Sequence, residues 1–283
     1  MVKQFKRMEL KLYAAATLLA VTAIFTGCNK SNDEAAFDAN AEAISMQNNE
    51  TEDAVQDAID AAEDAFDGID DGLRSGRTEK TERCATITIN DNTRTITVDF
   101  GNGCNIGGNR TRRGRMTITY RGMRNMFAER TVVFDRYNNG SHTVSGTITI
   151  SDRTLSGSIL SYNVLGTNLT ITRPNGKQIQ ISELRRNVRY NFGNRPLDVS
   201  DDEIQVTGSI TGTAEDSRAF TSTIITPVLM KGSCVRANTF YPVSGRYEIK
   251  SGNLTAYADW GNGECDKKIT ITVGSITITR TMP

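Results

Sequence analysis

The stretch Asp99-Phe100-Gly101-Asn102-Gly103-Cys104 recurs near the end of the chain as Asp259-Trp260-Gly261-Asn262-Gly263-Glu264-Cys265. Each copy follows a run in which apolar and polar residues alternate, which is the pattern of a strand with one buried face. The strand then enters a Gly-Asn-Gly turn that ends on a cysteine. We therefore expect the two ends of one β-domain to be built in the same way.

The alternation continues outward from these two stretches. Turn-forming pairs separate the alternating runs, and two of them, Asn139-Gly140 and Asn175-Gly176, suit type I′ hairpins. Runs of this kind form antiparallel sheets with one face in water. The runs include residues 86–89, 95–98, 117–120, 147–150, 169–172, 269–273 and 276–279.

Further turns are predicted at Asp91-Asn92 and Ser251-Gly252-Asn253. Glycines inside strand patterns usually mark bulges, and here they follow an apolar residue and a Ser or Thr. The fold class is therefore mostly β, an antiparallel meander of about a dozen strands. It forms either a sandwich or one long curled sheet over residues 84–283, preceded by one amphipathic helix. The glycines are Gly146, Gly157, Gly208 and Gly245.

Residues 51–75 predict an acidic amphipathic helix. Apolar residues from Val55 to Leu73 recur at spacings of three and four among Asp and Glu, which gives one apolar face. The pattern leaves open whether this helix lies on the β-domain, pairs with a partner helix or acts as a stalk. Residues 28–50 are polar and rich in Asn, so we expect a flexible tether there.

Residues 1–27 predict a lipoprotein signal peptide. Basic residues precede an apolar run from Leu12 to Phe25, which is too short to span a bilayer as a mature helix. Thr26 and Gly27 then precede Cys28 directly. This arrangement resembles the lipobox of bacterial lipoproteins, and the resemblance implies that Cys28 becomes the lipid-bearing N-terminus. Two or more acyl chains anchor a protein stably to a membrane.

The formal net charge of zero hides a separation of charge along the chain. Residues 29–72 carry 14 acids and one base, whereas residues 73–283 carry 28 bases and 18 acids. Many of those bases are arginines spread singly along strands, which is typical of a solvated sheet face. We expect no nucleic-acid partner and no cofactor.

Four cysteines remain after Cys28, and an exported protein is expected to oxidise them. They allow three connectivities. We predict local pairing, Cys84 with Cys104 and Cys234 with Cys265, because each pair brackets one hairpin. Such bridges close loops of some 20–30 residues and contribute roughly 3–4 kcal/mol in the chain-entropy treatment.

Taken together, the lipobox, the acidic helical leader and the two Asp-aromatic-Gly-Asn-Gly motifs resemble uncharacterised secreted lipoproteins of Bacteroidetes-type bacteria. The resemblance covers nearly the whole chain. It implies an outer-membrane lipoprotein on the periplasmic or the surface-exposed face. It implies no activity.

Calcium is the metal that the sequence favours most, because several oxygen ligands fall into one tight loop. We assign no metal site, and calcium remains a weak candidate. A zinc site is not expected, since the cysteines lack CxxC spacing and His142 is the only histidine. His142 is also the only candidate for a catalytic histidine, and we interpret it as a solvated loop residue. The calcium candidates are Asp259, Asn262, Glu264 and Asp266.

Two further patterns are weaker indications of a functional site. Carboxylates in or beside strands leave open a glycosidase-like pair, and a dense basic run could contact phosphate or carboxylate groups of surface polysaccharide. The carboxylates are Asp135, Glu183, Glu203 and Glu248, and the basic run is Arg110, Arg112, Arg113 and Arg115.

The sequence thus predicts a lipid-anchored cell-envelope protein that acts by binding or as a structural surface component, with no catalytic residue assigned. Its partners would be the membrane, through the lipid, and an envelope polysaccharide or protein. A carbohydrate-active hydrolase with paired carboxylates is the first alternative. A subunit of an adhesin or fibre, in which a sheet edge accepts a partner strand, is the second.

Overall fold

The computed structural model describes residues 32–75, 84–107, 110–125, 127–195, 198–236 and 241–282. The long helix α1 spans Asn32–Ser75, and the strands follow it. The first nine strands are β1 (Thr86–Asn90), β2 (Thr95–Asp99), β3 (Cys104–Gly107), β4 (Arg110–Tyr120), β5 (Arg130–Asn138), β6 (Thr143–Ser156), β7 (Ile159–Thr172), β8 (Gln178–Asn191) and β9 (Glu203–Thr213). The remaining strands are β10 (Ala219–Lys231), β11 (Ser244–Ser251), β12 (Leu254–Asn262), β13 (Lys268–Val273) and β14 (Ile276–Thr281). A 3-10 turn, η1 (Val199–Asp201), precedes β9, and the short helix α2 (Gly232–Arg236) follows β10.

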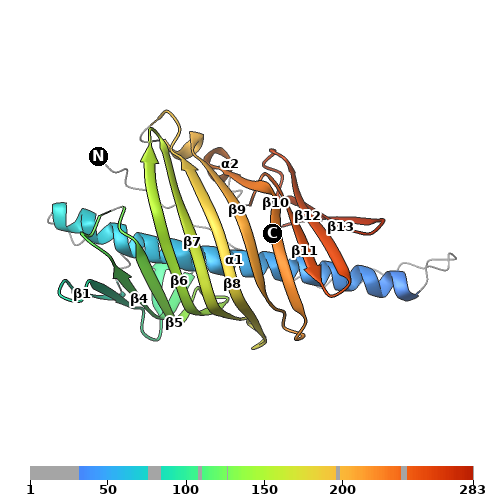
Figure 1. Cartoon of the computed structure of the whole chain (residues 1–283), viewed down its shortest axis with the longest axis horizontal. Helices are drawn as coiled ribbons and strands as arrows, with labels where there is room; N and C mark the ends of the chain where they lie inside the picture. Colours follow the sequence, from blue (N-terminus) through green and yellow to red (C-terminus); the bar gives the residue numbers. More distant parts are fainter. Residues whose placement is uncertain are drawn as a thin grey trace.

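All fourteen strands belong to one antiparallel sheet. Each strand pairs with its neighbours in the chain, except that β2 and β3 both pair with β4. The sheet is strongly twisted and curled, and α1 crosses its concave side (Figure 1). The prediction of an antiparallel meander is confirmed, and of its two forms the protein adopts the single curled sheet. We call the face under α1 the inner face and the opposite one the outer face.

Bulges bend the long strands, and glycines stand opposite them. Gly114 lies across from the bulge at Arg136, and Gly146 lies across from the bulge at Asn168. A Cβ atom on Gly146 would come within 2.4 Å of the Asn168 carbonyl oxygen, so no other residue fits there. The predicted strand glycines at 146, 208 and 245 occupy such close approaches. Gly157 does not, because it forms the hairpin turn between β6 and β7.

The first Gly-Asn-Gly stretch interrupts the chain between β2 and β3, and the second kinks the end of β12; neither is a hairpin turn. After Gly101 the chain resumes its pairing with β4, because Cys104 lies opposite Arg112. In the second copy Asn262 pairs with Ser244, and the Gly263 amide still donates to Val243. The hairpins themselves lie elsewhere. Those predicted at Asn139-Gly140 and Asn175-Gly176 form without type I′ geometry, since neither asparagine has a positive φ.

Helix α1 begins at Asn32, nearly twenty residues before the predicted start. The expected flexible tether over residues 28–50 is therefore wrong for residues 32–50. The polar residues in this segment do not point only to water, since Ser45, Asn48 and Asn49 are buried. Polar composition indicated a solvated segment, whereas the curled sheet supplies a surface that covers it. The predicted helical end at residue 75 agrees with the structure.

The helix lies on the β-domain, which settles the three arrangements that the sequence left open. At 1.5 Å per residue its 44 residues extend about 66 Å. Twelve strand spacings of about 4.8 Å amount to about 58 Å, so one helix is long enough to cross the whole sheet. Its apolar residues join those of the sheet in one continuous core. Neither helix in the described ranges combines the length and apolar character needed to cross a membrane.

Candidate functional site

The inner face of the sheet carries four buried arginines, each paired with an acid of α1. Their guanidinium groups reach the helix from four different strands. The sequence suggested solvated arginines, and for these four that interpretation is wrong. They are Arg112 on β4, Arg130 on β5, Arg153 on β6 and Arg186 on β8.

Glu63 of α1 binds two of these arginines at once. Arg130 Nη2 donates to Glu63 Oε2 at 2.9 Å, and its Nε lies 2.8 Å from Oε1 as an ion pair. Arg153 is also in direct contact with this carboxylate. The Arg130 guanidinium also lies 4.1 Å from the ring centroid of Phe66, which is a cation–π contact. Phe66 in turn meets Tyr120 edge to face. Charge and aromatic packing therefore hold the same turn of the helix.

Asp57 makes the second buried contact. It accepts a hydrogen bond from the Tyr137 hydroxyl at 2.7 Å and pairs with Arg112 at 3.3 Å. Arg112 also lies over the Tyr137 ring. Removing one partner of a buried ion pair costs more than the pair contributes to stability, because a charge is then left without compensation. These contacts therefore specify where on the sheet the helix lies.

A third cluster lies at three adjacent hairpin ends. Arg173 donates to both Glu50 oxygens, at 2.7 and 2.9 Å, and also contacts Glu215. His142 Nε2 lies 3.6 Å from Glu50, so the predicted solvated histidine faces the helix. The His142 ring and the Arg173 guanidinium hold the pKa of Glu50 below its ordinary value. This cluster explains His142 as a helix contact, and no catalytic role is needed for it.

Two further ion pairs join α1 to the sheet, one buried and one near the last strand. Arg186 of β8 contacts Glu52 directly. At the last strand, Arg280 donates to both oxygens of Glu42, at 2.6 and 2.9 Å. The ion pairs therefore extend from the last strand of the sheet to the fourth. Six arginines of the basic body thus pair with acids of the leader within the same chain.

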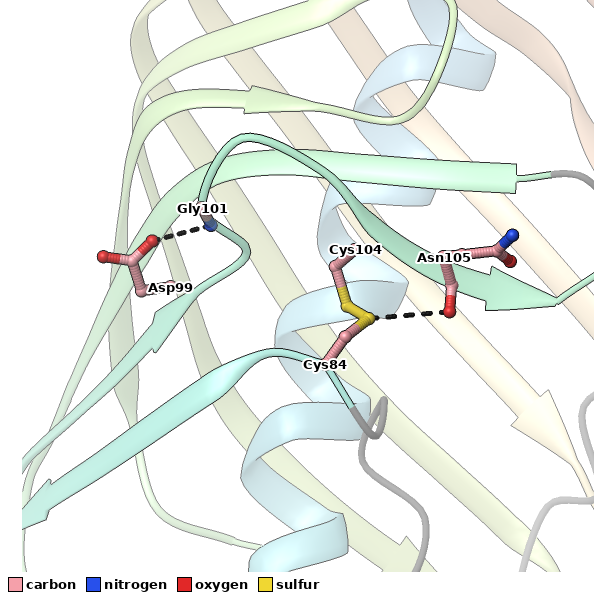
Figure 2. The surroundings of a disulfide bond; sticks show 5 residues. All are labelled: Cys84, Asp99, Gly101, Cys104 and Asn105. Carbon is pink, nitrogen blue, oxygen red and sulfur yellow. Dashed lines mark hydrogen bonds between the residues drawn. A yellow bond between two sulfur atoms is a disulfide. The ribbon is translucent and has the colours of Figure 1, made fainter.

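The two disulfides join Cys84 to Cys104 and Cys234 to Cys265, which confirms the predicted pairing. The first links the start of β1 to β3 (Figure 2). Cys84 Sγ also lies 3.5 Å from the Asn105 carbonyl oxygen. A disulfide sulfur carries no hydrogen, so this is a sulfur–oxygen contact. The second disulfide links α2 to the segment after β12.

The two Gly-Asn-Gly stretches share one local geometry. Asp99 accepts a hydrogen bond from the Gly101 amide at 2.8 Å, and Asp259 accepts one from the Gly261 amide at 2.8 Å. The aromatic residue after each Asp is buried. Arg115 and the Gly101 amide hold the pKa of Asp99 below its ordinary value. In both copies the Asp carboxylate therefore accepts a hydrogen bond from the backbone amide two residues later, which stabilises the local bend of the chain.

Two of the four calcium candidates, Asp259 and Asp266, accept backbone hydrogen bonds within the protein, and Glu264 is exposed. Asp259 is occupied as above, Asp266 accepts from the Lys268 amide at 3.1 Å, and Asn262 belongs to the β11–β12 ladder. In the described ranges no group of three or more Asp, Glu, His or Cys side chains is placed to hold a metal ion. The geometry therefore gives the calcium hypothesis no support.

The four candidate carboxylates do not form a catalytic pair. Asp135, Glu183 and Glu248 lie on β5, β8 and β11, so neighbouring members are three strands, or about 14 Å, apart. A glycosidase pair requires about 5–9.5 Å. Glu203 starts β9, roughly 27 Å along the strand from the position opposite Glu183. The structure thus separates these four residues.

The basic run on β4 divides between the two faces of the sheet. Arg112 is buried on the inner face, whereas Arg113 and Arg115 are exposed. Arg113 donates to the Asn102 carbonyl, and Arg115 binds Asp99 at 2.6 Å. The side chain of Arg110 lies outside the described residues. Among the described side chains of this run only Arg113 and Arg115 are exposed, and each binds a group of the protein itself.

A row of hydrogen-bonded polar side chains crosses the outer face. Asn187 on β8 donates to Asn163 on β7 at 2.9 Å, and Asn163 donates to Asp152 on β6 at 2.9 Å. All three side chains are exposed, and Arg185 stands beside them. We call these three residues the amide row. Spacing in the sequence does not reveal it, because the register that aligns three strands is not visible there.

Cys28 and the predicted signal peptide lie outside the described residues. Comparisons with protein-family models, with curated proteins and with solved structures found no match to this chain.

Proposed function

We propose that this chain is a lipid-anchored protein of the bacterial cell envelope. Its lipobox and its Asp-aromatic-Gly-Asn-Gly motifs resemble those of secreted bacterial lipoproteins. The N-terminal basic residues, the short apolar run and Cys28 support export and lipidation. Two disulfides in the folded part fit an oxidising compartment. The acyl chains would place the protein in the outer membrane, on its periplasmic or its outer face.

The role of the folded part is binding or structural, and one observation carries this proposal. The concave inner face, where a curled sheet would otherwise receive a ligand, is covered by α1, whose acids pair with arginines from β5 to β14. The outer face is therefore the surface left for a partner. Its amide row presents planar hydrogen-bonding groups, as sugar hydroxyls require. An envelope polysaccharide is the partner that this chemistry fits.

Lipidation is tested by replacing Cys28 with serine in the full chain expressed in a host with lipoprotein processing. We expect the unaltered protein to partition into the detergent phase and the Cys28→Ser variant to remain in the aqueous phase. Cys234→Ser is a control that loses a disulfide but keeps the anchor. Equal partitioning of wild type and Cys28→Ser would contradict lipidation.

Binding is tested by electrophoresis of the native protein through gels that contain purified envelope polysaccharide. We expect the wild type to be retarded and the double variant Asn163→Ala, Asn187→Ala to migrate freely. Gln178→Ala changes an exposed amide on the same strand away from the row and is the matched control. Migration of the wild type at the same rate with and without polysaccharide would leave a structural role as the proposal.

The hydrolase alternative gains no support from geometry, since its four candidate carboxylates are separated as described above. A fibre subunit needs an open sheet edge, and the two edges of this sheet differ in a way that points to another form of assembly.

A further inference from the structure

Three strands pair with only one neighbour among the described residues: β1, β14 and the short β3, which pairs with β4 alone. Of these, β1 and β14 lie at the two ends of the strand order and are the edge strands compared below. An edge strand presents a row of backbone N–H and C=O groups that can pair with another chain. Proteins usually block such edges with a charge on the inner face, a proline, a lysine or a bulge. The two edges of this sheet therefore need to be compared residue by residue.

The β14 edge is blocked. Arg280 projects from the inner side of β14, where its register partner is the buried Ile269. Its guanidinium is bound by both oxygens of Glu42 of α1. If a strand of a second copy paired with β14, its inner-face side chains would lie next to this ion pair. An inward charge of this kind is one of the devices that prevent edge pairing.

The β1 edge carries none of these devices. Its five residues, Thr86–Asn90, include no charged residue and no proline, and the β1–β2 ladder runs without a register shift. Ile87 and Ile89 lie on the inner face, opposite Val98 and Ile96. Ile89 is 39% exposed although its ladder partner Ile96 is fully buried. The core of the sheet is thus incomplete at this edge.

We infer that two copies of this chain join through β1, in an antiparallel pair with a two-fold axis at Thr88. An antiparallel pair centred on Thr88 places Ile87 of one copy opposite Ile89 of the other and Thr86 opposite Asn90. Directly opposite residues in a ladder share a face, so the isoleucines complete the inner face and the threonines the outer one. The axis is perpendicular to the sheet, and both helices lie on the same side.

The β1–β1 contact cannot continue beyond two copies. An isologous contact uses the same surface on both copies, so it stops at a dimer. A fibre would need β1 to pair with β14 of the next copy, and Arg280 opposes that. The interface is only one short strand on each side, and small interfaces are transient in dilute solution. The experiment must therefore capture the contact.

The test introduces a cysteine at the two-fold axis. In Thr88→Cys the two new thiols of a dimer lie opposite each other on the outer face, and mild oxidation is expected to give a covalent dimer on a non-reducing gel. Thr277→Cys places an equally exposed cysteine on the β14 edge and is expected to stay monomeric. Both are made in the full exported chain, and peptide mapping verifies that the disulfides Cys84–Cys104 and Cys234–Cys265 are retained.

A second variant tests whether the covalent dimer forms from the specific β1 contact or from random encounters between molecules in solution. Adding Ile89→Lys to Thr88→Cys places a charge on the inner face of β1 and is expected to abolish the covalent dimer. Without new cysteines, the sedimentation coefficient of the wild type should rise with protein concentration, and that of Ile89→Lys should not. The inference is overturned if Thr88→Cys stays monomeric, if Thr277→Cys dimerises equally, or if Ile89→Lys changes neither readout. Lipidation is read from detergent partitioning, so either proposal can fail alone.

Discussion

The two halves of helix α1 contact the sheet in different ways. Residues 54–66 bury a wide apolar stripe of alanine, valine, isoleucine and phenylalanine, and they hold the buried pairs of Asp57 and Glu63. Residues 42–53 bury Ile44 together with polar side chains, and the ion pairs of Glu42 and Glu50 lie nearer to solvent than that of Glu52. The C-terminal half of the helix therefore belongs to the hydrophobic core, whereas the N-terminal half contacts the sheet mainly through polar and charged side chains.

This difference teaches which signals a sequence carries for a buried helix. The C-terminal half follows the usual amphipathic rule and was predicted as a helix. The N-terminal half buries asparagine, serine and threonine, which are rarely buried and are typical of solvated segments. Measurements that perturb matched residues in the two halves can test whether the halves also differ in energy.

The largest expected difference is between Glu63→Gln and Glu42→Gln. Glu63→Gln leaves two buried guanidinium groups without a counter-charge, so we expect a loss of about 3–5 kcal/mol of unfolding free energy. Glu42→Gln breaks a pair whose side chains are 45% and 34% exposed, and we expect about 0–1 kcal/mol. Urea denaturation of both variants measures this difference. Equal losses would show that the two halves hold the helix equally.

Packing is expected to differ next. Ala62 is 1% exposed in the apolar half, and we expect Ala62→Leu to cost about 1–3 kcal/mol because extra methylene groups must fit into a filled core. Ala43 is exposed on the same helix, and Ala43→Leu is the control with little expected change. Thermal unfolding followed by circular dichroism measures both. A tolerated Ala62→Leu would mean that the apolar half is loosely packed.

The polar half is expected to respond in the opposite direction to an apolar substitution. Asn48 is 3% exposed, and neither polar atom of its side chain has a hydrogen-bond partner among the described residues. We expect Asn48→Leu to stabilise the protein by about 1 kcal/mol, because it removes a buried polar group of similar size. A higher denaturation midpoint is the readout. Destabilisation would indicate that the Asn48 amide is satisfied in solution.

The smallest expected effect is a pH dependence at Glu50. Because its pKa is lowered in the folded state, Glu50 contributes stability above its unfolded pKa of about 4.3, and this contribution is lost as the pH falls through the lowered folded value. The free-energy difference between wild type and Glu50→Gln should thus be constant near neutral pH and shrink in acid. Urea titrations between neutral pH and pH 3 measure it. A difference that grows in acid would contradict this sign.

The buried arginines left a signal in the sequence that strand periodicity could have revealed. Arg130 is in phase with the buried Val132 and Phe134, and Arg186 is in phase with Leu184 and Val188. Period two therefore placed both on the inner face. Arg153 is different, because the bulge at Asp152 shifts it from the outer to the inner side.

The sequence by itself determined the strands, the helical end of the leader and the disulfide pairs. These features depend on neighbours close in the chain: alternating residues, turn pairs and cysteines about 20–30 residues apart. The register of the amide row, the separation of the four carboxylates and the kinks at the repeated glycines were decided only by the tertiary structure. Each of them depends on how distant strands align, which bulges adjust by one residue at a time.

The early start of α1 is the clearest case of a tertiary decision. Nothing local makes residues 32–50 amphipathic in the usual sense, and an isolated polar helix of this kind is marginal in water. The concave inner face offers Arg280 and Arg173 as partners for Glu42 and Glu50 of this segment. The acids of α1 and the arginines of the strands are far apart in the sequence, and only the curled sheet brings them into contact.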